Sequence, residues 1–281
     1  MKKYISIALI VFFALYLGSG CKKDKGNPPV LPPVESMLID FSNFESGKKS
    51  DPAINSTKGI ENSSWEFSAF VAGFWNVILG LNLAVPVATF DRATDNTPAY
   101  LDNKTWQWSY DVPVTISQVS VTYKARLTGQ ITATEVIWKM YISKTGTGAF
   151  AEFVWYEGTS KLDGTSGKWI INHSSQYPEA FLNIDWTKSS SEIATIKYTY
   201  VRTLNNNRVA DTFKNSYIEY GLTSASLDAY YNIHYYNGID FSDVNIEWNT
   251  TTNNGRVKSL GHFGNQDWYC WDANRINTLC P

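Results

Sequence analysis

The chain has 281 residues and a formal net charge of −2, and aromatic residues make up 15% of it. A charge so close to zero gives no indication of a nucleic-acid partner. The length is enough for a large β domain, and the abundance of Trp, Tyr, Ser, Thr and Asn is typical of strands and turns rather than of a helical bundle.

Residues 1–20 have the features of an export signal. Two N-terminal lysines precede the apolar run Tyr4–Leu17, which has the length of a secretory signal and is short for a bilayer span. The stretch Leu17–Cys21, with three small residues before the cysteine, resembles the lipobox of bacterial lipoproteins. The resemblance implies cleavage before Cys21 and attachment of lipid, palmitate among the acyl chains, which would anchor the protein permanently. A secreted protein with a cysteine near the end of its signal is the alternative.

Residues 21–36 are expected to form the acylated cysteine and a tether. The segment is first charged and then rich in proline, so it favours an extended polyproline geometry and buries little apolar surface. Lys22 stands where an inner-membrane retention signal would have Asp, which favours the outer membrane. The charged run after Cys21 resembles the export tags of surface lipoproteins in Bacteroidota and is too short to decide between the periplasmic face and the cell surface.

Residues 37–281 are expected to form a single β-rich domain. It begins with Met37–Phe44, a short strand or a helical turn. The segment 65–90 carries no charge between Glu66 and Asp91. Within it, large and small side chains alternate from Val77 to Val87, and this period of two favours an extended segment buried on both sides. A helix bent at Pro86 is the competing interpretation of residues 69–90, and a second membrane insertion is a further one.

The rest of the chain predicts an antiparallel meander of about nine to eleven strands, because alternating segments follow one another through short turns without helical connections. A long meander with one apolar face must close on itself or be covered. We therefore expect an all-β fold that forms a closed or half-open barrel, lipocalin-like in outline, with a sandwich as the alternative. The predicted strands are Val114–Leu127, Thr134–Ser143, Phe150–Tyr156, Lys168–His173, Phe181–Thr187, Ile193–Arg202, Tyr217–Leu222, Asp228–Tyr236, Asp243–Asn249 and Arg256–Leu260.

Two parts of the chain resemble uncharacterised β-rich outer-membrane lipoproteins of Bacteroidota. The first is Trp155–Trp186, with its Tyr-Glu-Gly, Leu-Asp-Gly-Thr-Ser-Gly-Lys-Trp and Leu-Asn-Ile-Asp-Trp phrases, and the second runs from Ile246 to Asp272. The resemblance implies a location and a fold class, and no activity.

The two cysteines that remain beside Cys21 are predicted to form a disulfide. Cys270 and Cys280 are an even pair in an oxidising compartment, and a bond between them would hold the C-terminal tail. A metal site is the alternative, but His262 and Asp267 do not supply ligands at a defined spacing. We expect neither a metal nor another cofactor.

The sequence offers little that indicates catalysis. The three histidines, His173, His234 and His262, are not at metal-binding spacing, and neither a nucleophile elbow nor a phosphate loop is present. A pair of strand carboxylates could support glycoside hydrolysis if the fold brought them together. Acids on the wet face of a sheet are the ordinary case, so we expect a protein that is not an enzyme. The carboxylates considered are Glu152, Asp185, Glu219 and Glu247.

The aromatic residues are the better indication of a binding function. Large rings at alternating strand positions fill a β core, and in an incompletely filled barrel they would line a cavity for an apolar, lipid-like ligand. The run from Asp228 to Gly238 carries tyrosines on both strand faces, so the alternative is an exposed platform for a glycan or a protein. The candidate ligand-binding residues are Trp138, Trp155, Trp186, Tyr198, Tyr230, Tyr231, Tyr235, Tyr236 and Trp248.

Overall fold

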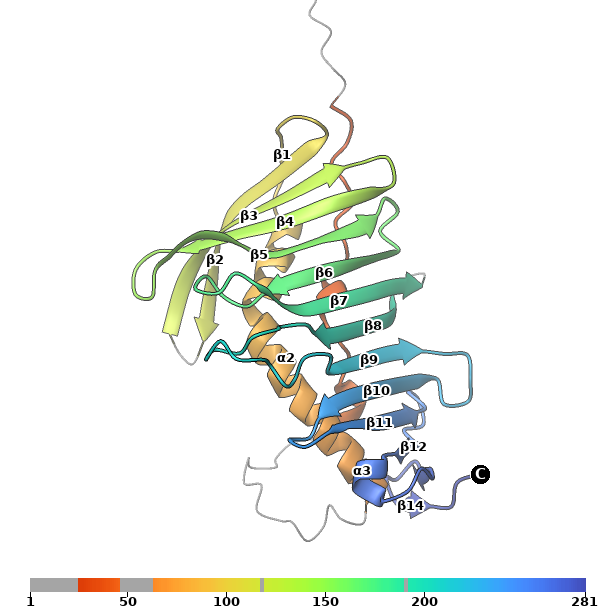
Figure 1. The fold of residues 1–281 in the computed structure, drawn as a ribbon. Coiled ribbons are helices and arrows are strands. Elements are labelled where there is room, and N and C mark those ends of the chain that lie inside the picture. The colour runs from red at the N-terminus through yellow and green to blue at the C-terminus, as the bar shows by residue number, and fades with distance from the viewer. Residues whose placement is uncertain (1–24, 46–62, 117–118, 190–191) are drawn as a thin grey trace, which may run out of the picture.

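The computed structural model describes residues 25–45, 63–116, 119–189 and 192–281. In these ranges it contains a 14-stranded antiparallel sheet in which every strand pairs with its neighbours in sequence order (Figure 1). The signal peptide and Cys21 lie outside the described residues. The strands are β1 (Ala99–Tyr100), β2 (Thr105–Ile116), β3 (Val119–Ile131), β4 (Glu135–Lys144), β5 (Phe150–Lys161), β6 (Ser166–Asn172), β7 (Ala180–Ser189), β8 (Glu192–Tyr200), β9 (Tyr217–Leu222), β10 (Ala229–Tyr236), β11 (Phe241–Trp248), β12 (Gly255–Lys258), β13 (Tyr269–Trp271) and β14 (Asn277–Thr278).

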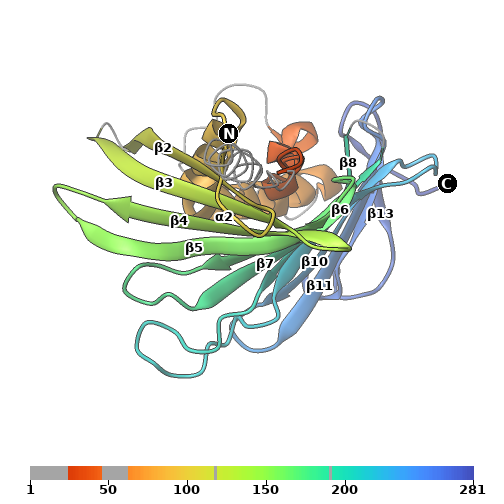
Figure 2. The same ribbon diagram turned by 90° about the horizontal axis from the view of Figure 1, so that it is seen from above.

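The predicted all-β meander is confirmed, and the sheet is open rather than closed. Strand β1 pairs with β2, and β14 pairs with β13, so the two ends of the sheet do not meet. Seen from above, the sheet curves around a helix and an N-terminal segment that lie in its concave face (Figure 2). The additional strands relative to the expected nine to eleven are mainly β2 and the short strands β1, β13 and β14.

The segment from Trp65 to Phe90 is a helix, so the extended conformation that we favoured from the sequence is wrong. Helix α2 (Ser64–Thr94) is 31 residues long and lies across the concave face of the sheet. Its most deeply buried apolar residues recur at helical spacing, as Ala72, Leu79, Leu83 and Phe90 show. The helix is apolar on nearly all sides, so its sequence shows no clear helical period. The alternation of large and small residues within it therefore suggested a strand.

The start of α2 is set by side chains. The hydroxyl oxygen of Ser63 accepts a hydrogen bond from the backbone N–H of Glu66 at 3.2 Å, which is the geometry of an N-cap. Within the described ranges, α2 is the helix that is long and apolar enough to cross a membrane, but 33% of its most apolar stretch is buried in the protein. Buried residues such as Ala72, Leu79, Leu83 and Phe90 pack α2 on the sheet, so we treat α2 as the cover of the sheet.

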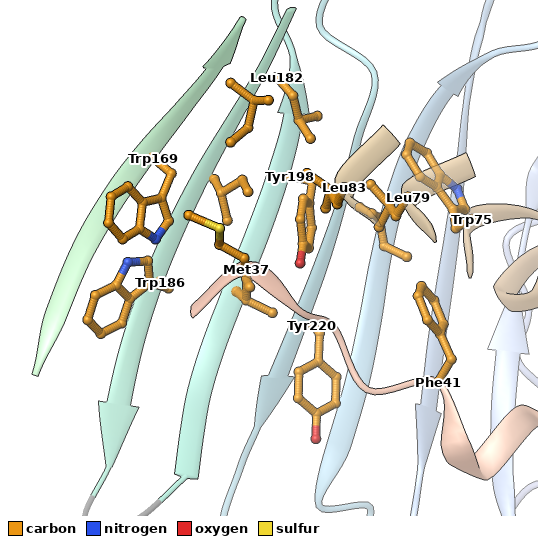
Figure 3. Packing of buried hydrophobic residues seen from close by; sticks show 14 of the residues in the cluster. Met37, Phe41, Trp75, Leu79, Leu83, Trp169, Leu182, Trp186, Tyr198 and Tyr220 are labelled. Carbon is orange, nitrogen blue, oxygen red and sulfur yellow. The ribbon is translucent and has the colours of Figure 1, made fainter. Parts of the chain in front are cut away.

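In the part of the predicted tether that the structure describes, residues 25–36, the chain also covers the sheet from Pro29 onward. Pro29, Pro32 and Ser36 are buried, and the Ser36 hydroxyl accepts a hydrogen bond from the indole N–H of Trp169 at 3.0 Å. Prolines have apolar rings, so an extended proline-rich segment can pack on a face of aromatic side chains. Two 3₁₀ turns, Val34–Met37 and Ser42–Phe44, follow in place of a first strand. Figure 3 shows the side chains of this layer meeting those of the sheet and of α2.

The concave face repeats one packing arrangement, in which a tryptophan lies opposite a glycine of the neighbouring strand. A β-carbon on Gly158 would lie 2.7 Å from the ring of Trp169, so the ring occupies the space that another side chain would need. This close approach lets large indoles lie flat along a curved sheet. The opposed pairs are Trp106 with Gly129, Trp138 with Gly129 and Gly158, Trp169 with Gly158, Trp186 with Gly167, and Trp248 and Trp271 with Gly255.

We predict opposite effects for two glycine-to-alanine substitutions. Gly158→Ala should lower the free energy of unfolding by about 1–3 kcal/mol, because the new methyl group would lie 2.1 Å from the carbonyl oxygen of Lys168. The matched control is Gly73→Ala on the exposed side of α2, where nothing lies within 4 Å. It should raise stability by up to about 1 kcal/mol through helix propensity. Urea denaturation measures both, and equal effects would contradict the packing argument.

The C-terminal tail holds the first turn of α2. Cys270 and Cys280 form a disulfide, as predicted, and the strand β14 lies between them in sequence. From this loop, the side-chain oxygen of Asn277 accepts a hydrogen bond from the backbone N–H of Ser64 at 2.9 Å. The guanidinium of Arg275 lies 4.1 Å from the centre of the Trp65 ring. The tail therefore ties the C-terminal end of the chain to the start of α2.

Removing the disulfide should destabilise both the C-terminal tail and the first turn of α2. Cys280→Ser, with Cys270→Ser to avoid a free thiol, should lower the free energy of unfolding by about 2–3 kcal/mol, the value expected for a loop with a sequence separation of 10. Hydrogen exchange should become faster in β13, β14 and the first turn of α2, and stay unchanged in β4–β7. Faster exchange confined to the tail alone would show that the tail does not hold the helix.

Candidate functional site

A groove runs between α2 and the ends of strands β6–β10. It has a volume of about 750 Å³, within the range of small-molecule sites, and none of its lining residues is Asp, Glu, Lys or Arg. One wall comes from α2 and the other from the sheet and its loops. The α2 residues are Phe67, Phe70, Val71, Phe74, Trp75, Ile78, Leu79 and Asn82, and the facing residues are His173, Phe181, Leu182, Tyr200, Phe213, Ser216, Tyr235, Tyr236, Asn237 and Gly238.

Large aromatic side chains at the groove are exposed to solvent. Phe70, Phe74 and Phe213 have relative exposures of 50%, 57% and 56%. Since exposed apolar side chains that gather in one place usually mark a binding surface, this cluster distinguishes the groove from the polar hollows on the outer face of the sheet. The lining from Phe67 to Asn82 corresponds to about 22 Å of helix, so the groove is elongated.

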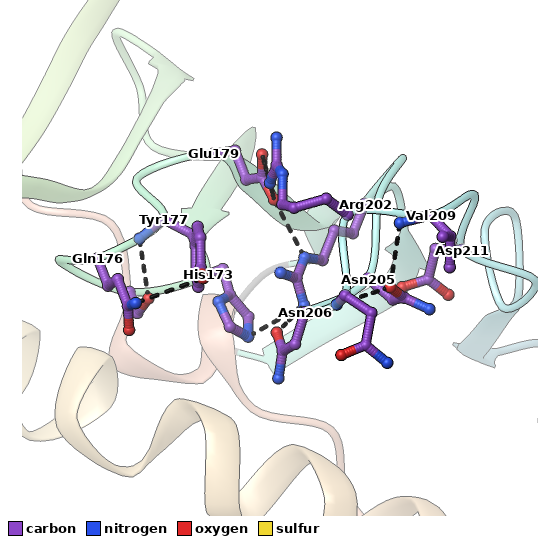
Figure 4. A network of polar contacts seen from close by, with 12 residues as sticks. His173, Gln176, Tyr177, Glu179, Arg202, Asn205, Asn206, Val209 and Asp211 are labelled. Atoms are coloured by element: carbon purple, nitrogen blue, oxygen red, sulfur yellow. Dashed lines mark hydrogen bonds and ion pairs between the residues drawn. The ribbon is translucent and has the colours of Figure 1, made fainter.

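A network of charged and polar residues borders the groove at the ends of β6–β8 (Figure 4). Its centre is Arg202, which is only 4% exposed. The Nε of Arg202 donates to the carboxylate of Glu179 at 3.2 Å, and Arg208 donates to the same carboxylate at 3.0 Å. The hydrogen bond from Arg208, followed by that from Arg202, lowers the pKa of Glu179. On the other side, Tyr200 donates its hydroxyl to Asp211 at 2.7 Å. Burial, and then Asp211, raise the pKa of Tyr200 to about 12.

The protonation of His173 follows from its neighbour. The Nη1 of Arg202 lies 3.4 Å from the Nε2 of His173, and a guanidinium can only donate, so Nε2 accepts and the ring carries its proton on Nδ1. Burial lowers the pKa of His173, and the charge of Arg202 lowers it further. His173 is therefore neutral, with an N–H on Nδ1.

Three polar atoms of this region have no hydrogen-bond partner among the described residues. They are the Nδ1 of His173, the Nη2 of Arg202 and the hydroxyl oxygen of Ser216. His173 and Ser216 line the groove, whereas Arg202 lies behind His173. A buried polar atom without a partner costs free energy, so it indicates strain or a site for a ligand.

The aromatic residues singled out from the sequence lie in several places: some in the core, some at the groove and others in neither. Trp138, Trp186, Tyr198 and Trp248 are buried in the concave face beneath the covering layer, and Tyr198 also lines a smaller hollow of about 240 Å³ on the other side of α2. Trp155 belongs to a separate cluster with Tyr123, Phe150 and Phe153.

The tyrosine-rich strand β10 has aromatic rings on both faces, as its alternation indicated. Tyr231 is buried beneath Phe41 and Phe44, so it is not part of an exposed platform. Tyr230 donates its hydroxyl to Glu219 at 3.0 Å on the opposite face of the sheet. Tyr235 and Tyr236, at the end of the strand, are the two predicted residues that line the large groove.

The groove residues of α2 were missed in the sequence because the segment was expected to be extended. The pattern that could have identified them is Ser63 followed by Glu66 directly before an apolar run, which resembles a capping box. A helix beginning there places Phe67, Phe70 and Phe74 at intervals of three and four residues, on one side of the helix.

Three of the four strand carboxylates are engaged in ion pairs, and Asp185 and Glu219 line the same polar hollow on the outer face of the sheet. Glu152 pairs with Arg126 at 2.6 Å, Glu247 with Arg256 at 2.6 Å, and Glu219 with Lys197 at 3.6 Å. The hydrogen bond from Arg126 lowers the pKa of Glu152, whereas a general acid of a glycosidase needs a raised pKa. Within the described ranges, His, Cys, Asp and Glu side chains form no group of three or more that could hold a metal ion.

The neutral state of His173 gives a testable pH dependence. A histidine whose pKa is lowered by folding stabilises the protein above its unfolded pKa of about 6.5, and this stability is lost as the pH falls through the folded value. We expect NMR titration to place the pKa of His173 below 6.5. In His173→Gln, the free energy of unfolding should fall less between pH 7 and pH 5 than in the wild type. A folded pKa at or above 6.5 would contradict the effect assigned to burial and to the charge of Arg202.

Comparisons of the chain with protein-family models, with curated proteins and with solved structures found no match in any of the three.

Proposed function

We propose that the protein is a lipoprotein of the cell envelope, anchored in the outer membrane through Cys21, that binds an apolar, lipid-like ligand in the groove between α2 and the sheet. The lipobox-like stretch Leu17–Cys21 supports the anchor. The observation that carries the binding function is the groove itself, whose lining residues are largely aromatic and aliphatic and include no charged side chain.

Apolar side chains that are exposed to water cost free energy. Apolar surface removed from water stabilises a complex by about 25 cal/mol per Å², so rings such as Phe70, Phe74 and Phe213 would gain stability from a ligand that covers them. In the closed or half-open β-barrel that the sequence predicts, the ligand would lie inside the barrel. The open sheet supports a different placement, in which α2 supplies one wall of the binding site.

We expect the soluble form spanning residues 22–281, purified without detergent, to carry a ligand. This form retains every residue that the structure describes, including the N-terminal segment packed on the sheet. Native mass spectrometry should show a bound mass that is released as lipid on denaturation. A bare protein that also fails to take up a neutral apolar fluorophore would contradict the proposed function.

Two substitutions on adjacent turns of α2 test the position of the ligand. Phe74→Glu places a charge in the groove and should weaken uptake of the fluorophore by at least about tenfold, because a buried charge without a partner is costly. Val77→Glu is the matched control, since Val77 is 62% exposed and does not line the groove. Equal losses in both variants would place the ligand elsewhere.

A further inference from the structure

The described chain begins at the β1 end of the sheet. The Nζ of Lys25, the first described residue, lies 5.6 Å from the centre of the Tyr100 ring in β1. The segment then packs along the sheet, since a β-carbon on Gly129 would lie 3.0 Å from the ring of Pro29. Figure 1 shows the segment leaving the domain beside β1, at the end opposite α3 (Leu260–Phe263). Packing therefore fixes the place at which the N-terminal segment leaves the domain.

Only a short stretch of chain separates this place from Cys21. Four Cα–Cα steps join Cys21 to Lys25, so their two α-carbons are at most about 14 Å apart. Helix α2 is about 46 Å long, and its first turn lies at the opposite end of the domain from β1 (Figure 1). A lipid on Cys21 would therefore hold the β1 end, and not the α3 end, close to the membrane.

Exposed aliphatic side chains lie at the β1 end. Leu101, directly after β1, is 49% exposed, and Leu162, in the turn between β5 and β6, is 45% exposed. Val30 is 65% exposed, and a β-carbon on Gly164 of the same turn would lie 3.9 Å from a methyl group of Val30. The start of β2 and the end of β5 lie on one edge of the sheet, because β2 to β5 are sequential antiparallel strands. The three side chains therefore share the edge along which the N-terminal segment runs.

Two aromatic rings next to Leu101 suit a membrane interface. Tyr100 and Trp106 are half-buried and pack edge to face, with their ring centres 5.2 Å apart. Tyr and Trp gather at the level of lipid headgroups, because each combines an apolar ring with a polar group. The aromatic pair therefore adds to the apolar character of this end of the domain.

The charged side chains at this edge balance one another. Lys161 lies opposite Glu135 across β4 and β5, and the turn before β2 carries one residue of each sign. Charge would therefore not draw this surface to a membrane, and apolar contacts would have to hold it there. The charged residues are Lys25, Lys104 and Lys161 against Asp102, Glu135 and Asp163.

We propose that the β1 end of the domain lies on the surface of the bilayer that holds Cys21, with Val30, Leu101 and Leu162 in the interfacial region. The short chain from Cys21 to Lys25 brings this end to the membrane, and the exposed aliphatic side chains gain stability by leaving water. This inference rests on the proposed function, because it requires the lipid anchor on Cys21.

The orientation also places the groove. Its α2 wall runs from Phe67 to Asn82, in the part of the helix that is far from β1. Asn82, the lining residue nearest to the end of α2 at Thr94, is about 18 Å from that end along the helix. The groove therefore stands away from the bilayer of its own anchor, and its ligand enters from the side of the aqueous space.

Single fluorophores test which side chains meet the bilayer. With lipid on Cys21 and a disulfide between Cys270 and Cys280, an introduced cysteine is the free thiol of the chain. The variants Leu101→Cys and Leu162→Cys of the full lipidated chain are labelled with an environment-sensitive fluorophore and reconstituted in phosphatidylcholine vesicles. Nitroxide-labelled phosphatidylcholine then serves as the quencher.

Matched controls carry the same fluorophore at exposed aliphatic positions far from the β1 end. Val77 is 62% exposed and lies about 26 Å along α2 from Thr94, and Ile239, in the turn after β10, is 85% exposed. We expect the quencher to reduce fluorescence at positions 101 and 162 at least about twofold more than at positions 77 and 239, because interfacial side chains reach the level of the nitroxide. High salt should leave the difference unchanged, since the charges at the edge balance.

The outcomes separate this inference from the proposed function. Vesicle flotation with equally weak quenching at all four positions would show a domain held off the membrane, which overturns the inference and leaves the anchor standing. Stronger quenching at Val77→Cys or Ile239→Cys than at Leu101→Cys would place another face on the bilayer and overturn it as well. A full-length chain that does not float with the vesicles would contradict the anchor of the proposed function itself.

Discussion

The structure depends on the covering of one apolar sheet face by one helix. An antiparallel meander that does not close exposes a whole face of large side chains, and such a face is stable only when another layer packs on it. Helix α2 and the N-terminal segment supply that layer, and buried residues such as Met37, Leu83 and Phe90 show where it meets the sheet. The tryptophan–glycine pairs contribute to the same end, because flat indoles leave room for a helix within the curve of the sheet.

The same constraint explains the composition of α2. An ordinary surface helix is apolar on one side, whereas α2 has no charge between Glu66 and Asp91. One side of α2 packs on the sheet through buried residues such as Leu79, Leu83 and Phe90. Part of the remainder, including Phe70 and Phe74, faces the groove, so its apolar character there has no role in holding the sheet. Residues that do not stabilise the fold are better explained by binding, and this is why the groove rather than the aromatic core is the candidate site.

The border of the groove contains both a stabilising ion pair and polar atoms without a hydrogen-bond partner. Arg202 is buried and bonded to Glu179, an arrangement in which removing one partner leaves an uncompensated charge. Arg202 also determines which nitrogen of His173 carries the proton, so a structural ion pair sets the hydrogen-bonding character of a groove residue. The carboxylates of the outer face, paired with Arg126, Lys197 and Arg256, show the more usual arrangement, in which opposite charges satisfy each other across strands.

The sequence by itself determined most of the strands, their order and the cysteine pair, since alternation and turn residues are local features and sequential antiparallel strands need no long-range information. It also contained the start of α2 in Ser63 and Glu66, but a nearly uniform apolar segment shows no clear period, so residues 65–90 were assigned to the wrong element. Only the tertiary structure decided that the sheet stays open, that α2 forms a wall, and that His173 meets Arg202. Those contacts join residues from different elements, and they depend on register and on how one layer packs against another.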